Sequence, residues 1–401
     1  MDKKHIVTYH LIAVLCLTAA VLTACSGDDA GDSTPAISRG VRLQTSARQF
    51  QVGDLQAGAP AQTRGTVTLP DANWSGYLQL YPETNPNMLL FVAKPTNNPS
   101  SSDVISRLFS FSALDHDWQA NITINDTSPE YQLFGFLPID AGHSSDNVSV
   151  GLLPSATNYM AGALMTVRGL KVLTDSDPCV IVGVAKAADK NADVTLTWGH
   201  FGYYFTSSTT ADVTDYMYLL LDHIYSRYHF QLKVNADYDA LRTFRVTKMT
   251  VEALDNSGTQ TLGSVDAAVA VRSNTTNSNP LSSVTYRRNN GERVFTLYDK
   301  ETQNSYGFTP NATQYKEIGS CLAPADQRWF QLTTWYEVLD GSGTVIRTDK
   351  AVNRFNIGVS LTKKILSTTP GMDHKIQILV NPTYLQMLSD YDLTNPAFTI
   401  N

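Results

Sequence analysis

The sequence predicts an all-β protein, and three observations carry this prediction. Charged residues make up only 17% of the 401 residues, while 42% are hydrophobic, which is enough apolar material for substantial cores. Thr, Ser, Asn, Val and Tyr are abundant, and these residue types favour strands and turns over helices. Short apolar stretches separated by turn residues recur along the chain, with the spacing typical of a sandwich or barrel.

The clearest strand pattern lies near the middle of the chain. In residues 228–234 every second residue is apolar, so Phe230 is expected to point into the core and His229 to the opposite face. A charged side chain in place of Phe230 should therefore destabilise the fold strongly, whereas Asp in place of His229 should destabilise it only a little. The preceding residues 219–221 are all Leu, a run too short for a membrane helix and typical of chain that passes through the interior.

Further strands are expected on both sides of this one. The predicted strands lie at residues 66–69, 77–81, 88–92, 122–124, 131–137, 178–184 and 375–380. Two β-hairpins are expected around the turns 255–258 and 340–343, because Asn, Asp and Gly tolerate the positive φ that such turns need. Polar, turn-forming residues 235–238 mark a domain junction, which divides the chain into a domain of residues 41–236 and a domain of residues 237–401.

The N-terminus has the pattern of a bacterial lipoprotein signal. Residues 1–24 contain two lysines followed by an apolar run and end in Leu-Thr-Ala, directly before Cys25. This resembles the lipobox, in which a peptidase cuts before the cysteine and the cysteine receives the lipid. Cys25 is therefore the predicted lipidation site, and the small, acidic residues 25–40 are predicted to be a flexible tether.

Residues 41–52 form a further strand candidate, followed by a stretch with the composition of an exposed loop. That loop, residues 53–65, is rich in Gly, Ala and Gln and contains Arg64 near its end.

Motifs for catalysis are absent from the sequence. There is no G-x-S-x-G, H-E-x-x-H, C-x-x-C or phosphate-binding G-x-x-x-x-G-K-[ST] motif. Residues 115–117, Asp-His-Asp, and the pair Asp222-His223 place carboxylates beside imidazoles, but such pairs in a β protein are more often turns or solvated faces. We therefore expect no enzymatic activity, no cofactor and no metal site.

Cysteine use leaves two alternatives open. With Cys16 in the signal and Cys25 lipidated, Cys179 and Cys321 remain, either as one disulfide or as two buried thiols. The formal net charge of −7 and the lack of a basic block make nucleic acid an unexpected partner.

Several blocks of sequence, in this order, resemble one known family. The blocks are Trp118, YQLFGFLP (131–138), DPCVIVGV (177–184), LLLDHIYSRYHFQL (219–232), the following YDALRTFRV, and NPTYLQMLSDYDLTNP (381–396). Together they resemble the fimbrillin-like lipoproteins, the subunits of type V pili, over most of the chain from about residue 40. The resemblance implies two tandem transthyretin-like β-sandwich domains and a lipoprotein at the outer membrane and cell surface. It also implies a structural or adhesive role as shaft, tip or anchor of a fimbria, with other fimbrial subunits as partners and host or bacterial surface ligands as further candidates.

The resemblance also implies a mechanism of assembly. In this family an arginine-directed protease removes an N-terminal strand, and a strand of the next subunit fills the gap. Here residues 41–52 would be the strand removed, with Arg64 as the cleavage candidate and Arg48 as the second choice. The candidate donor strand is the apolar C-terminal segment, with these residues as its anchors: Tyr384, Leu385, Leu388, Phe398 and Ile400.

A surface lipoprotein that captures a glycan or peptide is the alternative. Stacking on exposed aromatic side chains would then provide the binding platform, with Trp74, Trp198 or Trp335 as candidates, although these tryptophans also suit a core.

Overall fold

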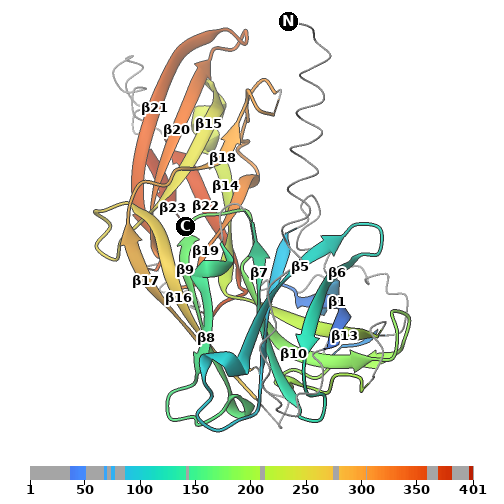
Figure 1. Ribbon diagram of the computed structural model, residues 1–401. Helices are drawn as coiled ribbons and strands as arrows, with labels where there is room; N and C mark the ends of the chain where they lie inside the picture. The colour runs from blue at the N-terminus through green and yellow to red at the C-terminus, as the bar shows by residue number, and fades with distance from the viewer. Residues whose placement is uncertain are drawn as a thin grey trace, which may run out of the picture. The chain divides into compact units, whose positions relative to one another are not determined.

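The computed structural model describes ten stretches of the chain, shown as coloured ribbon in Figure 1. They are residues 37–50, 67–69, 74–76, 86–140, 144–207, 213–273, 280–303, 305–358, 369–381 and 397–400. Strands dominate these stretches, which confirms the all-β prediction. The helices described are one turn of α-helix, α2 (Ala236–Asp239), and the 3-10 turns η2 (Ser101–Asp103), η3 (Ser145–Asn147) and η4 (Tyr159–Ala161). None of the described helices combines the length and the hydrophobicity that crossing a membrane requires.

The largest sheet has nine strands. Their order is β10 (Cys179–Ala187), β13 (Thr214–His223), β1 (Ile37–Arg48), β6 (Asp117–Ile124), β5 (Val104–Ser112), β4 (Asn87–Ala93), β7 (Tyr131–Ile139) and β12 (Gly202–Tyr203), with β3 (Trp74–Gly76) paired to β1. Strand β7 also pairs with β10, at Cys179 with Leu137 and at Val180 with Phe136. The hydrogen-bonded circuit therefore closes on itself, and β1 is one of its members.

Three four-stranded sheets and one two-stranded pair complete the described strands. The first is β19 (Lys316–Pro324), β14 (Tyr225–Val234), β22 (Asp373–Asn381) and β23 (Ala397–Ile400). The second is β18 (Phe295–Asp299), β15 (Thr243–Leu254), β20 (Trp329–Leu339) and β21 (Val345–Asn356). The third is β17 (Leu281–Asn290), β16 (Leu262–Arg272), β9 (Gly162–Lys171) and β8 (Val148–Leu152), and the pair is β11 (Val194–Thr195) with β2 (Val67–Thr68).

Hydrogen bonding between strands crosses the predicted domain junction at residues 235–238. Strands β8 and β9 precede the junction but share a sheet with β16 and β17, which follow it. Strand β14 likewise pairs with β19 and β22, whereas β13, only one residue earlier, pairs with β1 and β10. The chain thus changes sheets at Ile224, whose amide donates to the carbonyl of Pro178. The division into residues 41–236 and 237–401 stays a prediction.

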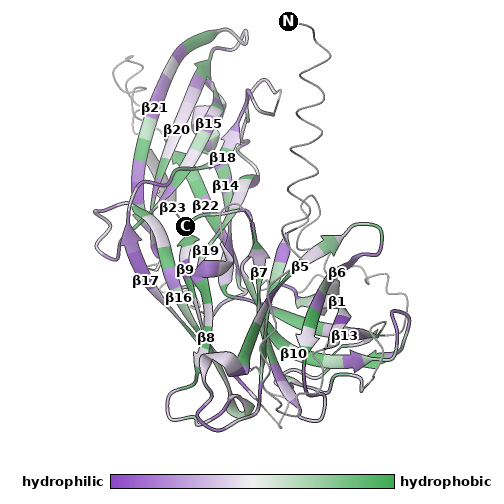
Figure 2. Ribbon diagram, viewed as in Figure 1, coloured by the Kyte–Doolittle hydropathy of each residue, from purple (hydrophilic) through white to green (hydrophobic). Residues whose placement is uncertain are grey.

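The predicted core strand is present as β14. Tyr228, Phe230, Leu232 and Val234 are each fully buried, and the residues between them are half-buried, as the alternation predicts. Residues 219–221 are fully buried within β13. Figure 2 shows the same alternation of apolar and polar residues on many of the strands.

The His229 side chain contacts a carboxylate on each of the two neighbouring strands. Its Nδ1 lies 2.8 Å from Glu317 Oε1 on β19, and its Nε2 lies 2.7 Å from Asp373 Oδ1 on β22. The ring thus links β14 to both of its neighbours. This geometry reverses the expectation that Asp is mild at position 229, because Asp would place a third carboxylate between two others.

Most of the other predicted strands are confirmed. Residues 88–92, 122–124, 131–137 and 375–380 lie within β4, β6, β7 and β22, residues 179–184 begin β10, and Val67–Thr68 form β2. The strand expected at 41–52 is β1, which begins and ends four residues earlier. Residues 77–81 lie outside the described residues.

One of the two predicted hairpins is correct. Around residues 340–343, β20 and β21 pair antiparallel along their whole length. Around residues 255–258 the turn forms, but β15 and β16 meet only at the bridge between Leu254 and Thr261 and then enter different sheets. The hairpin prediction there is wrong, because the turn residues set the local reversal and the long-range strand partners set the sheet.

Candidate functional site

Strand β1 is the centre of the candidate site, because it joins parts of the chain that are far apart in sequence. It is parallel to β13, with Val41 opposite Asp215, and antiparallel to β6, with Leu43 opposite Trp118. Hydrogen bonds hold it on both sides, and Figure 1 shows it in blue beside both strands. Val41, Leu43 and Ala47 are buried, so the strand also contributes to the core.

An ion pair fixes β1 near its beginning. Arg39 Nη1 lies 3.0 Å from Asp215 Oδ2, and both side chains are completely buried. The same nitrogen donates to the carbonyl of Thr206 at 2.6 Å. Asp215 also accepts from the amide and hydroxyl of Thr206 and from the hydroxyl of Tyr203. Burial, together with the charge of Asp215, raises the pKa of Tyr203, so its hydroxyl is protonated and donates.

A second pair of contacts lies on the other face of β1. Arg42 Nη2 lies 2.8 Å from Asp115 Oδ2, and Arg42 Nε lies 2.7 Å from Asp117 Oδ2. The Arg42 guanidinium, followed by the Gln119 amide, lowers the pKa of Asp115. The Asp-His-Asp segment, read from sequence as a turn, does turn at His116, which has a φ of 57°. Its two carboxylates bind β1, which the spacing of residues 115–117 could not reveal.

The end of β1 is held by Asp222 and His223 of β13. Arg48 Nη1 lies 3.2 Å from Asp222 Oδ2, and His223 Nε2 donates to the Arg48 carbonyl. Burial raises the pKa of Asp222, an effect that Arg48 opposes. The guanidinium of Arg48 also lies 5.6 Å from the ring centroid of Trp198.

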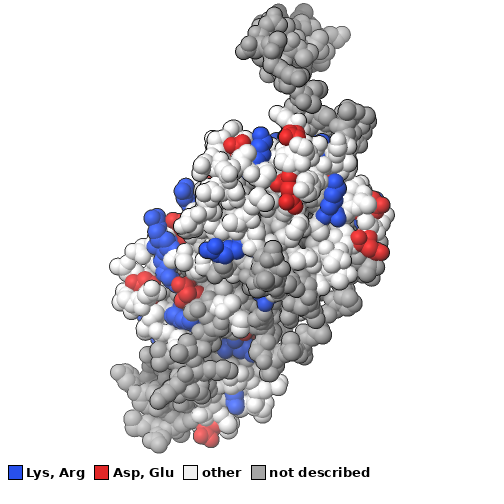
Figure 3. Space-filling view, turned by 90° about the horizontal axis from the view of Figure 1, so that it is seen from below, with Lys and Arg blue, Asp and Glu red and all other residues white. Residues whose placement is uncertain are grey.

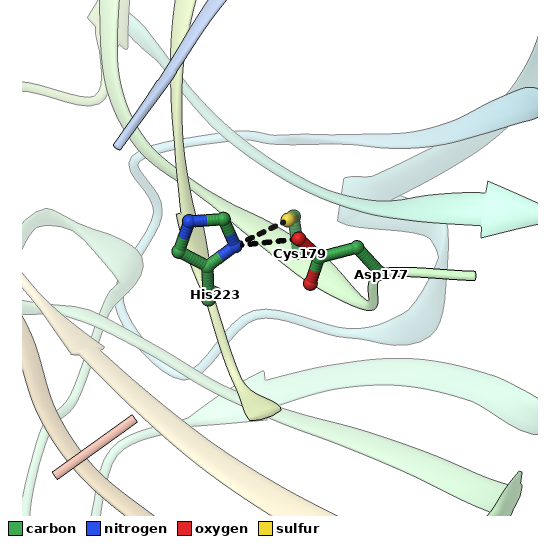
Figure 4. A group of neighbouring side chains, drawn as sticks. All are labelled: Asp177, Cys179 and His223. Carbon is green, nitrogen blue, oxygen red and sulfur yellow. Dashed lines mark hydrogen bonds and ion pairs between the residues drawn. The ribbon is translucent and has the colours of Figure 1, made fainter. Parts of the chain in front are cut away.

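His223 belongs to a cluster that the sequence did not reveal, shown in Figure 4. Its Nδ1 lies 2.8 Å from Asp177 Oδ2 and 3.6 Å from Cys179 Sγ, and all three side chains are buried. Because Nε2 donates to a carbonyl and Nδ1 faces a carboxylate, the geometry favours an imidazolium with a proton on each nitrogen. Burial alone would lower the pKa of His223, but Asp177 and then Asp222 raise it overall.

Asp, Cys and His side chains are types that ligate metal ions. In this cluster the three ligand atoms all lie within 4.8 Å of one another, close enough for a metal site to be considered. Two ligand atoms around tetrahedral zinc, at bond lengths of about 2.0–2.2 Å, are about 3.4 Å apart. The separation of 2.8 Å between His223 Nδ1 and Asp177 Oδ2 is instead that of a hydrogen-bonded ion pair. We therefore describe the cluster as a buried ion pair beside a thiol.

An aromatic side chain that follows β1 packs against the histidine of this cluster. The Phe50 ring stacks on the His223 ring with centroids 4.0 Å apart and planes 20° apart. The guanidinium of Arg227 lies 4.1 Å from the centroid of the Phe50 ring. Phe50 therefore lies between two cations, an arrangement that the negative faces of an aromatic ring favour. Cys179 and Cys321 are buried thiols that are not joined in a disulfide, which resolves the alternatives left open by the sequence.

The other predicted site residues have these positions. Cys25, Arg64, Tyr384, Leu385 and Leu388 lie outside the described residues. Phe398 and Ile400 belong to β23, which pairs antiparallel with β22 over four residues.

The candidate tryptophans for ligand stacking occupy separate places. Trp198 and Trp335 are half-buried, and each has a cation near its ring: Arg48 at 5.6 Å from Trp198 and Lys350 at 5.1 Å from Trp335. The side chain of Trp74 lies outside the description.

On the face shown in Figure 3, Lys and Arg are interspersed with Asp and Glu, so this face has no block of one charge.

Comparisons with known proteins give likenesses only to solved structures. No family model matches the chain, and no curated protein matches it in sequence. One similar structure is a fimbrial protein from Bacteroides vulgatus, with 8% identity, a TM-score of 0.39, and coverage of 84% of this chain and 98% of that one. Another is the fimbrial anchor protein Mfa2 from Porphyromonas gingivalis, with 13% identity, a TM-score of 0.29, and coverage of 90% and 95%. At such identities and scores, what this chain does has to be argued from its own residues.

Proposed function

We propose that this protein is a structural or adhesive subunit of a fimbria at the cell surface, which assembles by exchanging β1 for a strand of another subunit. The observation that carries the proposal is the placement of β1. The first described strand of the chain is inserted between β13 and β6 and completes a closed circuit of strands.

Removal of β1 would create a strong binding site for another strand. It would leave the facing edges of β13 and β6 without hydrogen-bond partners and would expose the pockets filled by Val41, Leu43 and Ala47. An incoming strand would satisfy both needs, with backbone hydrogen bonds for affinity and side-chain pockets for specificity.

Cleavage after Arg64 is the proposed trigger, in preference to Arg48. The Arg48 side chain is paired with Asp222, and its carbonyl accepts from His223. A protease could bind Arg48 only after these contacts break, whereas Arg64 follows a segment with a loop composition.

The C-terminal segment is the proposed donor to another subunit. Among the described strands, β23, which contains Phe398 and Ile400, is an edge strand that pairs with β22 alone, through four residue pairs. So short a pairing can open at little cost, and the other candidate anchors, Tyr384, Leu385 and Leu388, precede it in the sequence.

Lipid attachment and domain organisation complete the proposal. Cys25 would carry the lipid after removal of residues 1–24, and residues 25–40 would tether the protein to the outer membrane. Two transthyretin-like domains remain the proposed division of the mature chain.

A glycan- or peptide-binding lipoprotein is the second candidate function. It needs an exposed aromatic platform, but Trp198 and Trp335 are half-buried beside cations. Neither of these two tryptophans offers a fully exposed ring. The contacts of β1, by contrast, support assembly, so we prefer assembly to ligand capture. Size-exclusion chromatography after limited proteolysis, with a subunit that offers a fitting donor strand present, separates the two candidates, because a ligand receptor should stay monomeric.

Limited trypsin treatment of the lipid-free protein tests the proposed function. We expect one early cut after Arg64, followed, in the presence of a subunit with a fitting donor strand, by oligomers whose amount rises with protein concentration. Arg64→Ala is the matched control and should remain monomeric under the same conditions. Oligomers that form equally well in Arg64→Ala, or a clean cut after which the protein neither forms oligomers with a partner subunit nor takes up a strand peptide of residues 37–50, would overturn the proposal.

A further inference from the structure

All charged side chains of β1 are cations, and each is paired with acids of a neighbouring segment. Arg39 pairs with Asp215 of β13, and Arg48 pairs with Asp222 of the same strand. Arg42 pairs with Asp115, in the turn before β6, and with Asp117, the first residue of β6. Three arginines thus face four carboxylates, with apolar Val41, Leu43 and Ala47 between the first arginine and the last.

The carboxylates would remain when β1 leaves. Asp215 would keep the neutral donors Thr206 and Tyr203, with Lys186 Nζ 3.9 Å away as the one other cation paired with it among the described residues. Lys186 is 42% exposed, so its charge is screened by water, whereas Asp215 is completely buried.

Asp222 would keep the amide of His223, with the His223 ring as the nearest cation beside it. Asp117 would keep only Gln119 among the partners described for its side chain. A buried carboxylate without a close counter-charge is costly, so the vacated gap favours a strand that brings cations with it.

We propose that the gap between β13 and β6 selects a strand with cations at the positions of Arg39 and Arg48 and apolar residues between them, and rejects the C-terminal segment of a second copy. This inference rests on the proposed strand exchange. Residues 382–401 contain no Lys, Arg or His and contain Asp390 and Asp392. Two further carboxylates would be placed against four, which disfavours a homopolymer.

The occupant is therefore a strand of a different subunit, one with basic residues nine positions apart. The C-terminal segment of this chain can still act as donor to a subunit whose gap is not acidic. The protein is thus a member of a heteropolymer, in which the gap and the donor of one chain do not fit each other.

Peptide exchange tests this specificity directly. The full chain, cut after Arg64, is incubated with one of three fluorescent peptides: residues 37–50, the same peptide with Arg39→Gln, Arg42→Gln and Arg48→Gln, or residues 382–401. We expect the first peptide to bind at least about tenfold more tightly than the glutamine peptide, and the third to bind no better than the glutamine peptide. Equal binding of residues 37–50 and 382–401 would overturn the inference.

A second measurement separates this inference from the proposed function. In the uncut chain, Arg39→Gln should lower the Tm by several degrees, and Arg39→Gln combined with Asp215→Asn should recover part of the loss. Arg42→Gln is the control and should cost less, because Arg42 and Asp115 are partly exposed and the buried Asp117 keeps the Gln119 amide, whereas Arg39 and Asp215 are both completely buried. If Arg39→Gln melts like the wild-type chain, the charge requirement is wrong whether or not strands exchange. If the Tm results hold but even residues 37–50 fail to bind, strand exchange itself is wrong, and the inferred partner falls with it.

Discussion

His229 is the residue whose protonation should couple the stability of one sheet to pH. Its hydrogen bond to Asp373 raises its pKa, burial opposes this, and the hydrogen bond to Glu317 raises it further, so that the net shift is upward. A raised folded-state pKa means that the imidazolium stabilises the fold. This contribution is fully present below the unfolded pKa of about 6.5 and is lost as the pH rises through the folded pKa.

We therefore expect His229→Gln to destabilise the protein by about 1 kcal/mol at about pH 5.5 and by clearly less at about pH 8.5. Denaturant unfolding of both chains at the two pH values measures this difference. A loss of the same size at both pH values would contradict the role given to the imidazolium.

Phe230 tests the interior of the same strand. Its side chain is completely buried and lies edge-on to Phe330, with ring centroids 6.1 Å apart. Phe230→Asp should cost about 3 kcal/mol or more, because an unpaired carboxylate would lie in an apolar site. Phe230→Leu is the size control and should cost about 1.5 kcal/mol or less. Thermal melting compares the three proteins, and equal melting of Phe230→Asp and Phe230→Leu would show that position 230 is solvated.

At the scale of residues, the sequence predicted which side chains of a strand are buried, but not which distant side chains they contact. The alternation of residues 228–234 predicted which side chains are buried, because the period of a strand is local. The acids that bind Arg39 and Arg48 lie about 175 positions further along the chain, and no spacing rule connects them. The same is true of Asp177 and Cys179, which meet His223 only through the pairing of β10 with β13.

At the scale of elements, two turns of similar sequence make a matched pair. Residues 255–258 (Asp-Asn-Ser-Gly) and 340–343 (Asp-Gly-Ser-Gly) both end in a glycine with positive φ, 72° at Gly258 and 82° at Gly343. A Cβ added at Gly258 would lie 2.7 Å from the Trp329 ring, whereas one added at Gly343 would have no atom within 4 Å.

Alanine at Gly343 should therefore cost only the backbone strain, about 1–2 kcal/mol. Alanine at Gly258 should cost at least about 1 kcal/mol more, because the Trp329 ring must shift. Urea unfolding of the two variants measures the difference. Equal losses would mean that the contact between this turn and Trp329 is wrong.

The same two turns show what could be predicted at this scale. In both, the Asp carboxylate accepts amide hydrogen bonds from residues that follow it, so composition alone was enough to predict a reversal. Whether the flanking strands pair was decided elsewhere. Strand β15 pairs with β18 and β20, whereas β16 pairs with β9 and β17.

At the scale of the whole molecule, the lipid proposed at Cys25 would hold the protein at the membrane. Lipid transfer requires the thiol, so Cys25→Ala should leave the chain unlipidated and poorly retained at the membrane. Labelling of expressing cells with a radioactive fatty acid, followed by membrane fractionation, measures both effects. Normal labelling of Cys25→Ala would contradict the lipoprotein assignment.

The sheet arrangement is the part of the fold that the sequence could least reveal. Length and composition predicted an all-β chain, but the pairing of β9 with β16 joins residues about 100 positions apart. Strand pairing of this kind depends on long-range complementarity, which local propensity does not contain. The exchange proposed for β1 was suggested by the sequence only through the family resemblance.

The most direct test of the central claim is to tie β1 to its neighbour. Val41 of β1 and Ala120 of β6 are opposite residues in the antiparallel ladder, a placement in which Cβ atoms lie about 5 Å apart. Val41→Cys combined with Ala120→Cys should form a disulfide, while the native Cys179 and Cys321 stay buried. After cleavage at Arg64, the oxidised variant is analysed by size-exclusion chromatography with and without reductant, beside the wild-type chain. If β1 must leave for assembly, the oxidised variant will remain monomeric in the presence of a competent donor strand and will assemble once reduced. Assembly of the oxidised variant as fast as that of the reduced one would contradict the claim that β1 is the exchanged strand.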